Sequence, residues 1–223
     1  HRTYKLGRVT QFLMAFLGTT AAQKGVLWWA GHHRHHHKYS DEETDIHSPK
    51  RGFWWSHVGW TLCKKYDETP HDRIKDFADY PEIQWLNRHW LVPPTMLAVA
   101  LVLIGGWSML LIGFFLSTAL LYHGTFTINS LSHVFGKRRY ATTDTSRNNW
   151  LLALITLGEG WHNNHHHWQA SANQGFYWWE VDVSYYVIKA MEKLGLAWDV
   201  KTPPQKVLMS KRLDLVDDDG ELL

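Results

Sequence analysis

The sequence has only one cysteine, Cys63, among its 223 residues. A single cysteine excludes an internal disulfide, a paired-cysteine redox motif and an iron–sulfur cluster held by cysteine thiolates. A strong excess of positive charge is lacking too, because the net charge is +2 and no basic stripe with interleaved aromatic residues is present. We therefore expect no nucleic-acid partner. The chain begins with His1 and not with Met, and no signal-peptide pattern follows, so we expect an upstream segment.

Charged side chains are absent from residues 90–128. Pro93-Pro94 lies near the start of this stretch, where a helix tolerates proline. Gly105-Gly106 predicts a turn, and the arm that follows has about 20 apolar residues, enough to span a bilayer core. The first arm is shorter and would need tilt or local thinning of the bilayer. The pattern predicts a transmembrane hairpin at about 90–128, with a buried hairpin of a soluble helical protein as the alternative.

Lysine and arginine residues flank this hairpin on both sides. Because a short turn returns the second arm, both ends lie on one side of the membrane, and the positive-inside rule makes that side cytoplasmic. The flanking residues are Lys64, Lys65, Arg73 and Lys75 before the hairpin and Lys137, Arg138 and Arg139 after it.

Taken with the hairpin, the pattern of the remaining residues predicts an all-α fold. We expect an integral-membrane helical protein with a transmembrane hairpin and a cytoplasmic, histidine-rich helical cap. We expect an apolar helix within 9–30, an aromatic helix over 53–63 and an amphipathic helix over 176–196. Many of the 14 tryptophans sit at the edges of apolar runs, which is typical of a membrane-interface belt, although a dense aromatic core has the same composition. One domain covers 1–215, and 216–223 form an acidic tail that we expect to be disordered.

Histidines are concentrated in two short windows, His32 to His37 and His162 to His167, which contain nine of the 16 histidines. If each window is helical, three imidazoles stand on one face at i, i+3 and i+4. The triplets are His33, His36 and His37 in the first window, and His162, His165 and His166 in the second.

Two such triplets exceed the needs of one tetrahedral zinc ion. With His1 and His133, which lie beside apolar segments, eight imidazoles are available, and that number suits two metal ions. No pair of inward-facing Glu-x-x-His motifs is present, so a carboxylate-bridged di-iron bundle is not expected. An all-nitrogen dinuclear site remains, with iron favoured by ligand type. Surface, capping or packing roles are expected for five of the histidines that stand outside these sets, which are His35, His71, His89, His123 and His167.

Five stretches resemble the integral-membrane fatty acyl desaturases of the stearoyl-type delta-9 class. They are His1 to Lys5, His33 to Ser40, Arg51 to Trp60, Asn129 to His133, and Gly158 to His166. The resemblance covers nearly the whole chain in the right order, whereas the HxxHH box alone is shared with hydroxylases and alkane monooxygenases.

The resemblance implies a role for each matched residue. It makes His33, His36 and His37 the second histidine box and His162, His165 and His166 the third. It makes His133 a further ligand after the last membrane helix and Asn129 the holder of a metal-bound water. It makes His1 the second histidine of the first box, whose partner, with the first membrane hairpin, would precede this chain.

The implied reaction is the insertion of a cis double bond, at the delta-9 position, into a long-chain acyl substrate. Two iron ions would activate O2, with electrons from NAD(P)H delivered by a separate carrier resembling cytochrome b5, ferredoxin or rubredoxin. Side chains that fix the imidazole tautomers are expected nearby, and Glu159 and Asp45 are the candidates. Aromatic side chains would line the acyl tunnel, with ordinary core packing as the alternative: Trp29, Trp60, Phe126 and Trp161.

The substrate carrier is where the sequence departs from the resemblance. Animal acyl-CoA desaturases have Asn, Arg and Asp at the positions of Lys24, Gly31 and His32, so CoA recognition is weakened. Gln23, Lys64 and Lys65 remain as candidates for head-group contact. The substrate is therefore an acyl-CoA, an acyl-lipid or an acyl-carrier thioester.

Two other functions fit parts of the pattern. A membrane hydroxylase or alkane monooxygenase would use the same metal chemistry. A histidine-rich metal-binding or transport protein is disfavoured because His123 is the only ionisable residue of the apolar hairpin, which leaves no evident ion path.

Overall fold

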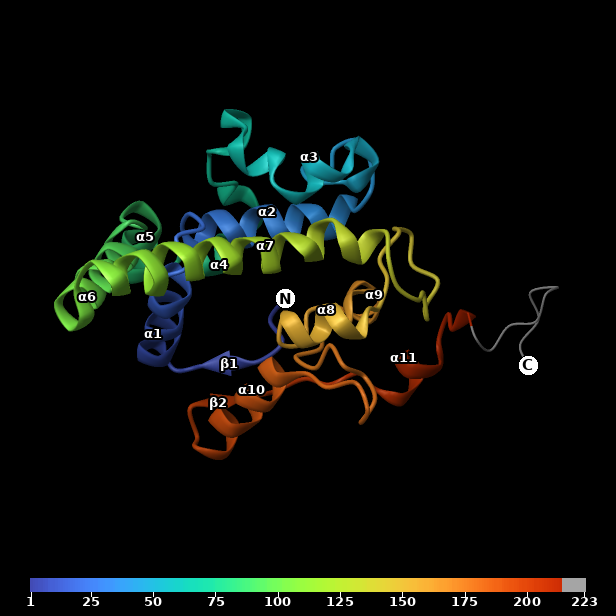
Figure 1. Ribbon diagram of the computed structural model, residues 1–223. Helices are drawn as coiled ribbons and strands as arrows, with labels where there is room; N and C mark the ends of the chain where they lie inside the picture. Colours follow the sequence, from blue (N-terminus) through green and yellow to red (C-terminus); the bar gives the residue numbers. More distant parts are fainter. Residues whose placement is uncertain (214–223) are drawn as a thin grey trace. The chain divides into compact units, whose positions relative to one another are not determined.

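The computed structural model describes residues 1–213 and is mostly helical. The expected acidic tail lies outside the described residues. The chain forms two compact units. Unit 1 contains His1–Gly7, Ser48–His57 and the chain from Thr127 onward, and unit 2 contains Arg8–His47 and Val58–Phe126. Each unit is therefore assembled from segments that are distant in sequence, and Figure 1 follows them by colour.

Unit 2 is built on helices, joined by three short 3-10 helices. The helices are α1 (Arg8–Thr19), α2 (Val26–Tyr39), α4 (Lys75–Ala78), α5 (Pro81–Arg88), α6 (Val92–Ser108) and most of α7 (Ser117–Asn129). The 3-10 helices span Gly59–Leu62, Lys64–Tyr66 and His71–Arg73. Helix α2 packs against α5, and helix α1 packs against both of them. Leu27, Ile74 and Ile83 form the buried core between them.

The apolar helix expected within 9–30 is two helices, α1 and α2. The hydroxyl groups of Thr19 and Thr20 donate to carbonyls of the last turn of α1, at 2.7 and 2.6 Å. Ala22 and Lys24 then adopt positive φ, which no helix continues through. The single-helix expectation is wrong here because apolar composition does not show where the backbone turns.

Helix α2 begins against the side chain of Asn87 on α5. Asn87 Oδ1 accepts the N–H groups of Leu27 and Trp28 at 3.1 and 3.0 Å, groups that a helix start leaves unsatisfied. A Cβ at Gly25 would lie 2.1 Å from this oxygen, so the residue before the helix must be glycine. The first histidine window therefore lies on a helix whose start is anchored by a neighbour.

One helical stretch of the described residues, Val92–His133, is long and apolar enough to cross a membrane, with a mean hydropathy of 2.4. It contains α6, a widened π-helical segment (Met109–Leu116), α7 and a final 3-10 turn (Leu131–His133). Proline occupies the first positions of α6, as the sequence predicts.

The backbone leaves helical geometry inside this stretch, at Gly105 and Gly106. A Cβ at Gly113 would lie 3.6 Å from Cδ1 of Leu101. Twelve residues along a continuous helix would be separated by about 18 Å, so the chain folds back on itself at the two glycines (Figure 1).

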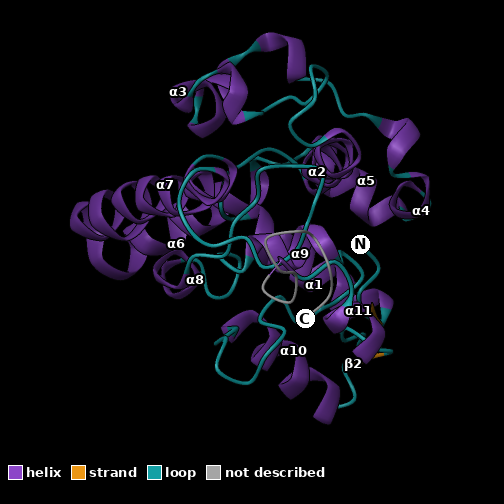
Figure 2. Cartoon of the chain, turned by 90° about the vertical axis from the view of Figure 1, so that its right-hand side faces the viewer, coloured by secondary structure: helices purple, strands orange, loops and turns teal. Residues whose placement is uncertain are grey.

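Unit 1 consists of short helices joined by long loops (Figure 2). A 3-10 turn (Pro49–Arg51) leads into α3 (Phe53–His57), and α8 (Trp150–Ile155), α9 (His162–His167), α10 (Val183–Lys193) and α11 (Gln205–Met209) follow. The strands β1 (Lys5–Leu6) and β2 (Ala197–Trp198) pair antiparallel and attach the start of the chain to this unit.

The expected helix over 176–196 is shorter than predicted. Asp182 caps α10 by accepting the N–H of Tyr185 at 2.9 Å, so the helix begins only at Val183. Gly195, with φ of 72°, follows its end. A Cβ at Gly160 would lie 2.1 Å from the backbone nitrogen of Ala153, so the turn before α9 packs directly on α8.

Candidate metal centre

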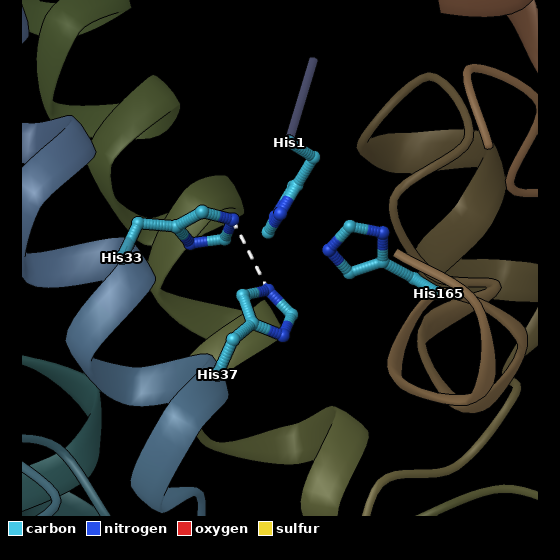
Figure 3. A group of neighbouring side chains, drawn as sticks. All are labelled: His1, His33, His37 and His165. Carbon is cyan, nitrogen blue, oxygen red and sulfur yellow. Dashed lines mark hydrogen bonds between the residues drawn. The ribbon is translucent and has the colours of Figure 1, made fainter. Parts of the chain in front are cut away.

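The first histidine triplet lies on α2 of unit 2. His33 and His37 are one turn apart, and their Nε2 atoms face each other at 3.2 Å. Arg34, on another side of the helix, donates to Asp76 at 2.7 and 2.9 Å and to the carbonyl of Arg73 at 2.8 Å. The helix is thereby fixed in rotation, and two imidazole nitrogens are directed at one point (Figure 3).

His36 faces a buried carboxylate in the same unit. Its Nδ1 lies 3.0 Å from both oxygens of Asp45. Asp45 is fully buried and also accepts the N–H groups of Asp41 and His47, at 2.9 and 3.2 Å. A carboxylate held in this way favours the proton of His36 on Nδ1, so the lone pair of the ring would lie on Nε2, where it could bind a metal ion.

The second triplet lies on α9 of unit 1, which is helical as the spacing requires. His133, at the end of the turn after α7, points to the same place. Nε2 of His133 lies 3.1 Å from Nε2 of His162, and the ring of His166 lies 4.3 Å from that of His162. The three side chains offer nitrogen atoms within 4.8 Å of one another. Unit 1 therefore gathers three imidazoles at one buried point.

Two further side chains hold these imidazoles from outside. Nδ1 of His166 lies 2.6 Å from Asp144, and Nδ1 of His133 lies 3.3 Å from the hydroxyl of Thr145. Burial opposes ionisation of Asp144, but the hydrogen bond and charge of His166, with the hydroxyl and N–H of Ser146, outweigh it and hold the pKa of Asp144 well below its usual range. An ionised Asp144 directs the other nitrogen of His166 inward.

Sequence reasoning missed Asp144. One signal was available, because Asp144 is the only acidic residue between Glu82 and Glu159. Its distance of 22 residues from His166 gives no local spacing that would connect the two.

The two residues between the histidines of α9 also have a structural role that the motif does not reveal. Asn163 and Asn164 are fully buried. Asn163 accepts the N–H groups of Arg139 and Tyr140, each at 2.8 Å. Asn164 donates to Glu180 at 2.9 Å. These amides fix α9 so that its histidine face is directed inward.

His1 and His165 form the remaining contact in unit 1. Their rings lie edge to face with centroids 5.0 Å apart. The first residues are held by the β1–β2 pair and by the N–H of Lys201, which donates to the carbonyl of Thr3 at 2.8 Å. Figure 3 draws this pair from unit 1 together with the His33–His37 pair from unit 2.

The other expected site residues are placed as follows. Asn129 ends α7, and its carbonyl accepts the hydroxyl of Ser56. Glu159 is exposed and makes no hydrogen bond to a histidine of the described chain, unlike Asp45. Gln23 is half-buried before α2. Lys64 and Lys65 are exposed on their 3-10 helix.

The expected tunnel residues have different surroundings. Trp60 and Phe126 are buried, and Trp60 stacks on Trp28 with ring centroids 5.6 Å apart. Trp29 is more exposed and stacks on His33 at 4.4 Å. Trp161 donates from its indole to the carbonyl of Val181 at 2.9 Å and lines a cavity of unit 1.

The donor chemistry of these clusters fits a metal site. Imidazole nitrogens face one another at 3.1 and 3.2 Å, and neighbouring carboxylates hold two of the rings by their far nitrogens. Such an arrangement presents lone pairs to a shared point. Clustered imidazoles in a mostly helical chain with one candidate membrane span are typical of one class, the histidine-ligated metalloproteins of membranes.

Comparison with known proteins narrows that class. A family model for fatty acid desaturases matches residues 1–198. The sn-1 stearoyl-lipid 9-desaturase of Synechocystis sp. is 39% identical over 212 residues, which are 95% of this chain and 67% of that protein. The sn-2 palmitoyl-lipid 9-desaturase of Nostoc sp. is 37% identical over 92% of this chain and 74% of that protein. The acyl-CoA C20 Delta5-desaturase of Anemone leveillei is 38% identical over 92% of this chain and 67% of that protein.

The chain belongs to the fatty acid desaturase family, and it is an oxidoreductase. The resemblance inferred from the histidine boxes is thereby confirmed.

Proposed function

We propose that this protein inserts a cis double bond at the delta-9 position of a long-chain acyl group carried by a membrane lipid. The observation that carries the proposal is that histidines converge within each unit of a member of this family, His133, His162 and His166 in unit 1 and His33 and His37 in unit 2. The names of two of the compared relatives specify acyl-lipid substrates and the 9 position, and a third names an acyl-CoA and the Delta5 position.

Two iron ions held only by histidine are part of the proposal. The proposed ligands are His1, His33, His36, His37, His133, His162, His165 and His166. Contacts within each unit support this ligand set. His133, His162 and His166 converge in unit 1, where His1 also lies against His165, and His33 faces His37 in unit 2. Neutral imidazoles leave the ions strongly charged, and bound iron would supply the activation of O2. Asn129 would hold a metal-bound water.

The residues of the chain would orient the ligands and the substrate. Asp45 and Asp144 hold protons on the outer nitrogens of His36 and His166. Buried Trp60 and Phe126 would exclude water beside the acyl chain, which must be held so that a single carbon–carbon bond meets the centre.

Packing in unit 2 supports a lipid substrate over acyl-CoA. Lys24 is paired with Asp67 at 2.7 Å. A Cβ at Gly31 would lie 2.5 Å from Cγ of Pro70, which leaves no room for the arginine that the animal acyl-CoA desaturases have at this position. His32 is buried and bonded to the carbonyls of Tyr66 and Glu68, at 3.1 and 3.2 Å. The three positions serve the fold of α2.

The helical arms on either side of Gly105-Gly106 would cross the membrane as a hairpin with both ends cytoplasmic. The basic residues that flank the hairpin support this orientation. A separate small electron carrier would then dock from the cytoplasm.

Expression of the natural gene in a desaturase-deficient host, followed by mass spectrometry of each lipid class, tests the proposal. The expected product is a cis-delta-9 monounsaturated acyl chain in a membrane lipid. A mainly hydroxylated product would contradict the proposed desaturase activity and show that the protein is a hydroxylase. Iron near two ions per chain supports the enzyme, whereas one readily exchanged zinc ion would favour metal transport.

A further inference from the structure

A cavity of about 620 Å3 lies in unit 1, just beyond the apolar stretch Val92–His133. Its first lining residue follows His133 by only three positions. The lining residues are Gly136, Lys137, Arg138, Arg139, Asn148, Asn149, Trp150, Trp161, Trp179 and Glu180. A volume of this size accommodates a small organic group.

Among residues 1–213, the lining of the cavity has an excess of positive charge. Arg139 is paired with buried Glu180, so these two charges cancel. Lys137 is exposed, and neither Lys137 nor Arg138 pairs with a carboxylate of the described residues. The chemistry of the lining therefore favours an anion.

A buried donor of Arg138 also points to an anionic ligand. Its Nη2 donates to the carbonyl of Thr142 at 2.7 Å, while its Nε is buried and makes no hydrogen bond within residues 1–213. A buried N–H without an acceptor costs free energy that a bound oxyanion would recover.

Besides the cations, three tryptophans belong to the lining of the cavity. Trp150, Trp161 and Trp179 line the cavity, and Trp150 and Trp179 are 65% and 53% exposed. Next to it, Leu151, Leu154 and Ile155 of α8 leave an apolar face exposed, and Trp178 is 88% exposed. Tryptophan and aliphatic residues beside cations, directly after a candidate membrane span, are typical of a protein surface at the bilayer interface.

We propose that this cavity binds the phosphate group of an anionic membrane phospholipid. Lys137 and Arg138 contact the phosphate, the tryptophans cover the glycerol and the first acyl carbons, and the outer face of α8 lies in the interface. The inference rests on the proposed membrane hairpin. A free phosphate ion would leave the three tryptophans without a partner group, and an acidic protein would leave the aliphatic face of α8 unburied. A lipid fits both the cations and the apolar residues.

The test uses the full-length protein in nanodiscs that contain equal amounts of phosphatidylglycerol and phosphatidylcholine. Native mass spectrometry then identifies the lipids that the released protein retains. We expect phosphatidylglycerol to be retained over phosphatidylcholine. A cation near a membrane surface contributes roughly a 5-fold preference for an anionic lipid. The variant Lys137→Ala with Arg138→Gln, which lacks two cations, should therefore show a preference for phosphatidylglycerol that is about 25-fold weaker. The matched control is Lys206→Ala with Lys193→Ala, two exposed lysines of the same unit, which retains the wild-type preference.

Titration calorimetry in detergent distinguishes the contribution of the tryptophans from that of the cations. Trp150→Ala weakens binding of dihexanoyl phosphatidylglycerol and leaves inorganic phosphate unaffected. Inorganic phosphate that binds as tightly as the short-chain lipid would reduce the cavity to a plain anion site. Equal retention of both lipids, or a double variant that loses only binding of an acidic electron-carrier protein, would also overturn the inference. Because lipid retention is measured without turnover, a protein that retains phosphatidylglycerol but forms no double bond contradicts only the proposed function.

Discussion

Hydrogen bonds to the outer nitrogens decide which imidazole nitrogen is available to a metal. Both triplets contain one histidine held by a buried carboxylate, Asp45 under His36 and Asp144 under His166. The spacing of the histidines was predictable from the sequence because it repeats within one helical turn. Their carboxylate partners were only partly predictable: Asp45 lies nine residues from His36, but Asp144 reaches α9 through the tertiary fold.

Replacement of a proposed ligand tests the metal assignment directly. We expect His37→Ala or His166→Ala to abolish desaturation, because each removes a nitrogen that no neighbour replaces, while membrane insertion is unchanged. Turnover and membrane fractionation are the measurements. His35→Ala is the matched control, because His35 lies on the same helix as His37 but bonds to the carbonyl of Thr44, at 2.7 Å. This variant should retain activity. Substantial residual turnover in either ligand variant contradicts the assignment.

Asp144→Asn leaves the shape of the side chain almost unchanged and removes its charge. Partners of this kind typically contribute 10- to 100-fold to metal affinity, so we expect a loss of about that size. Iron content after dialysis against a graded chelator series measures it. Asp199→Asn is the control, because Asp199 pairs with Lys5 at the surface at 3.0 Å. If both variants retain iron equally, Asp144 does not orient a ligand.

The ion pair between Arg8 and Glu82 in unit 2 predicts a pH dependence of stability. The hydrogen bond from Arg8 lowers the pKa of Glu82 from 4.5 to about 2. The contribution of a carboxylate with a lowered pKa is complete above its unfolded value and disappears as the pH falls towards the folded value. Thermal unfolding of the wild type should therefore lose this part of its stability between about pH 4.5 and 2. Glu82→Gln should lack that part of the decline, and a parallel decline in both proteins would argue against the pair.

Among the elements, helices with a periodic chemical signal were predicted better than those defined by composition. The triplets on α2 and α9 are helical as expected, and proline marks the start of α6. The boundary between α1 and α2 was missed because it depends on positive φ at Ala22 and on the distant Asn87. The buried Asn163-Asn164 anchor was missed for the same reason, since its partners come from other loops.

The fold-back inside the apolar stretch depends on Gly106. Its φ of 64° and ψ of −153° lie in a region that only glycine enters easily. We expect Gly106→Ala to cost about 1–3 kcal/mol and to lower the yield of folded protein in detergent. Gly124→Ala, in α7 with open space around the new methyl group, should leave the yield unchanged. Gel filtration of both variants makes the comparison, and equal yields would mean that the turn does not need glycine.

At the scale of the whole molecule, neither unit alone contains all eight of the proposed ligands. Unit 2 contributes His33, His36 and His37, while unit 1 contributes the others, although segments of each unit interrupt the other along the chain. The family was predictable because the boxes are local motifs. The division into units was not, because it depends on which distant segments pack together.

Metal removal tests whether the two units share their ions. A ligand that binds only the folded state stabilises every segment that contributes to its site. Removal of iron with a reductant and chelator should therefore raise amide hydrogen exchange in both α2 and α9, and addition of Fe²⁺ should reverse it. The peptide that contains α10 is the internal control, because it holds no proposed ligand. Faster exchange in α9 alone would assign the iron to unit 1 and contradict the shared ligand set, because α2 then binds no metal.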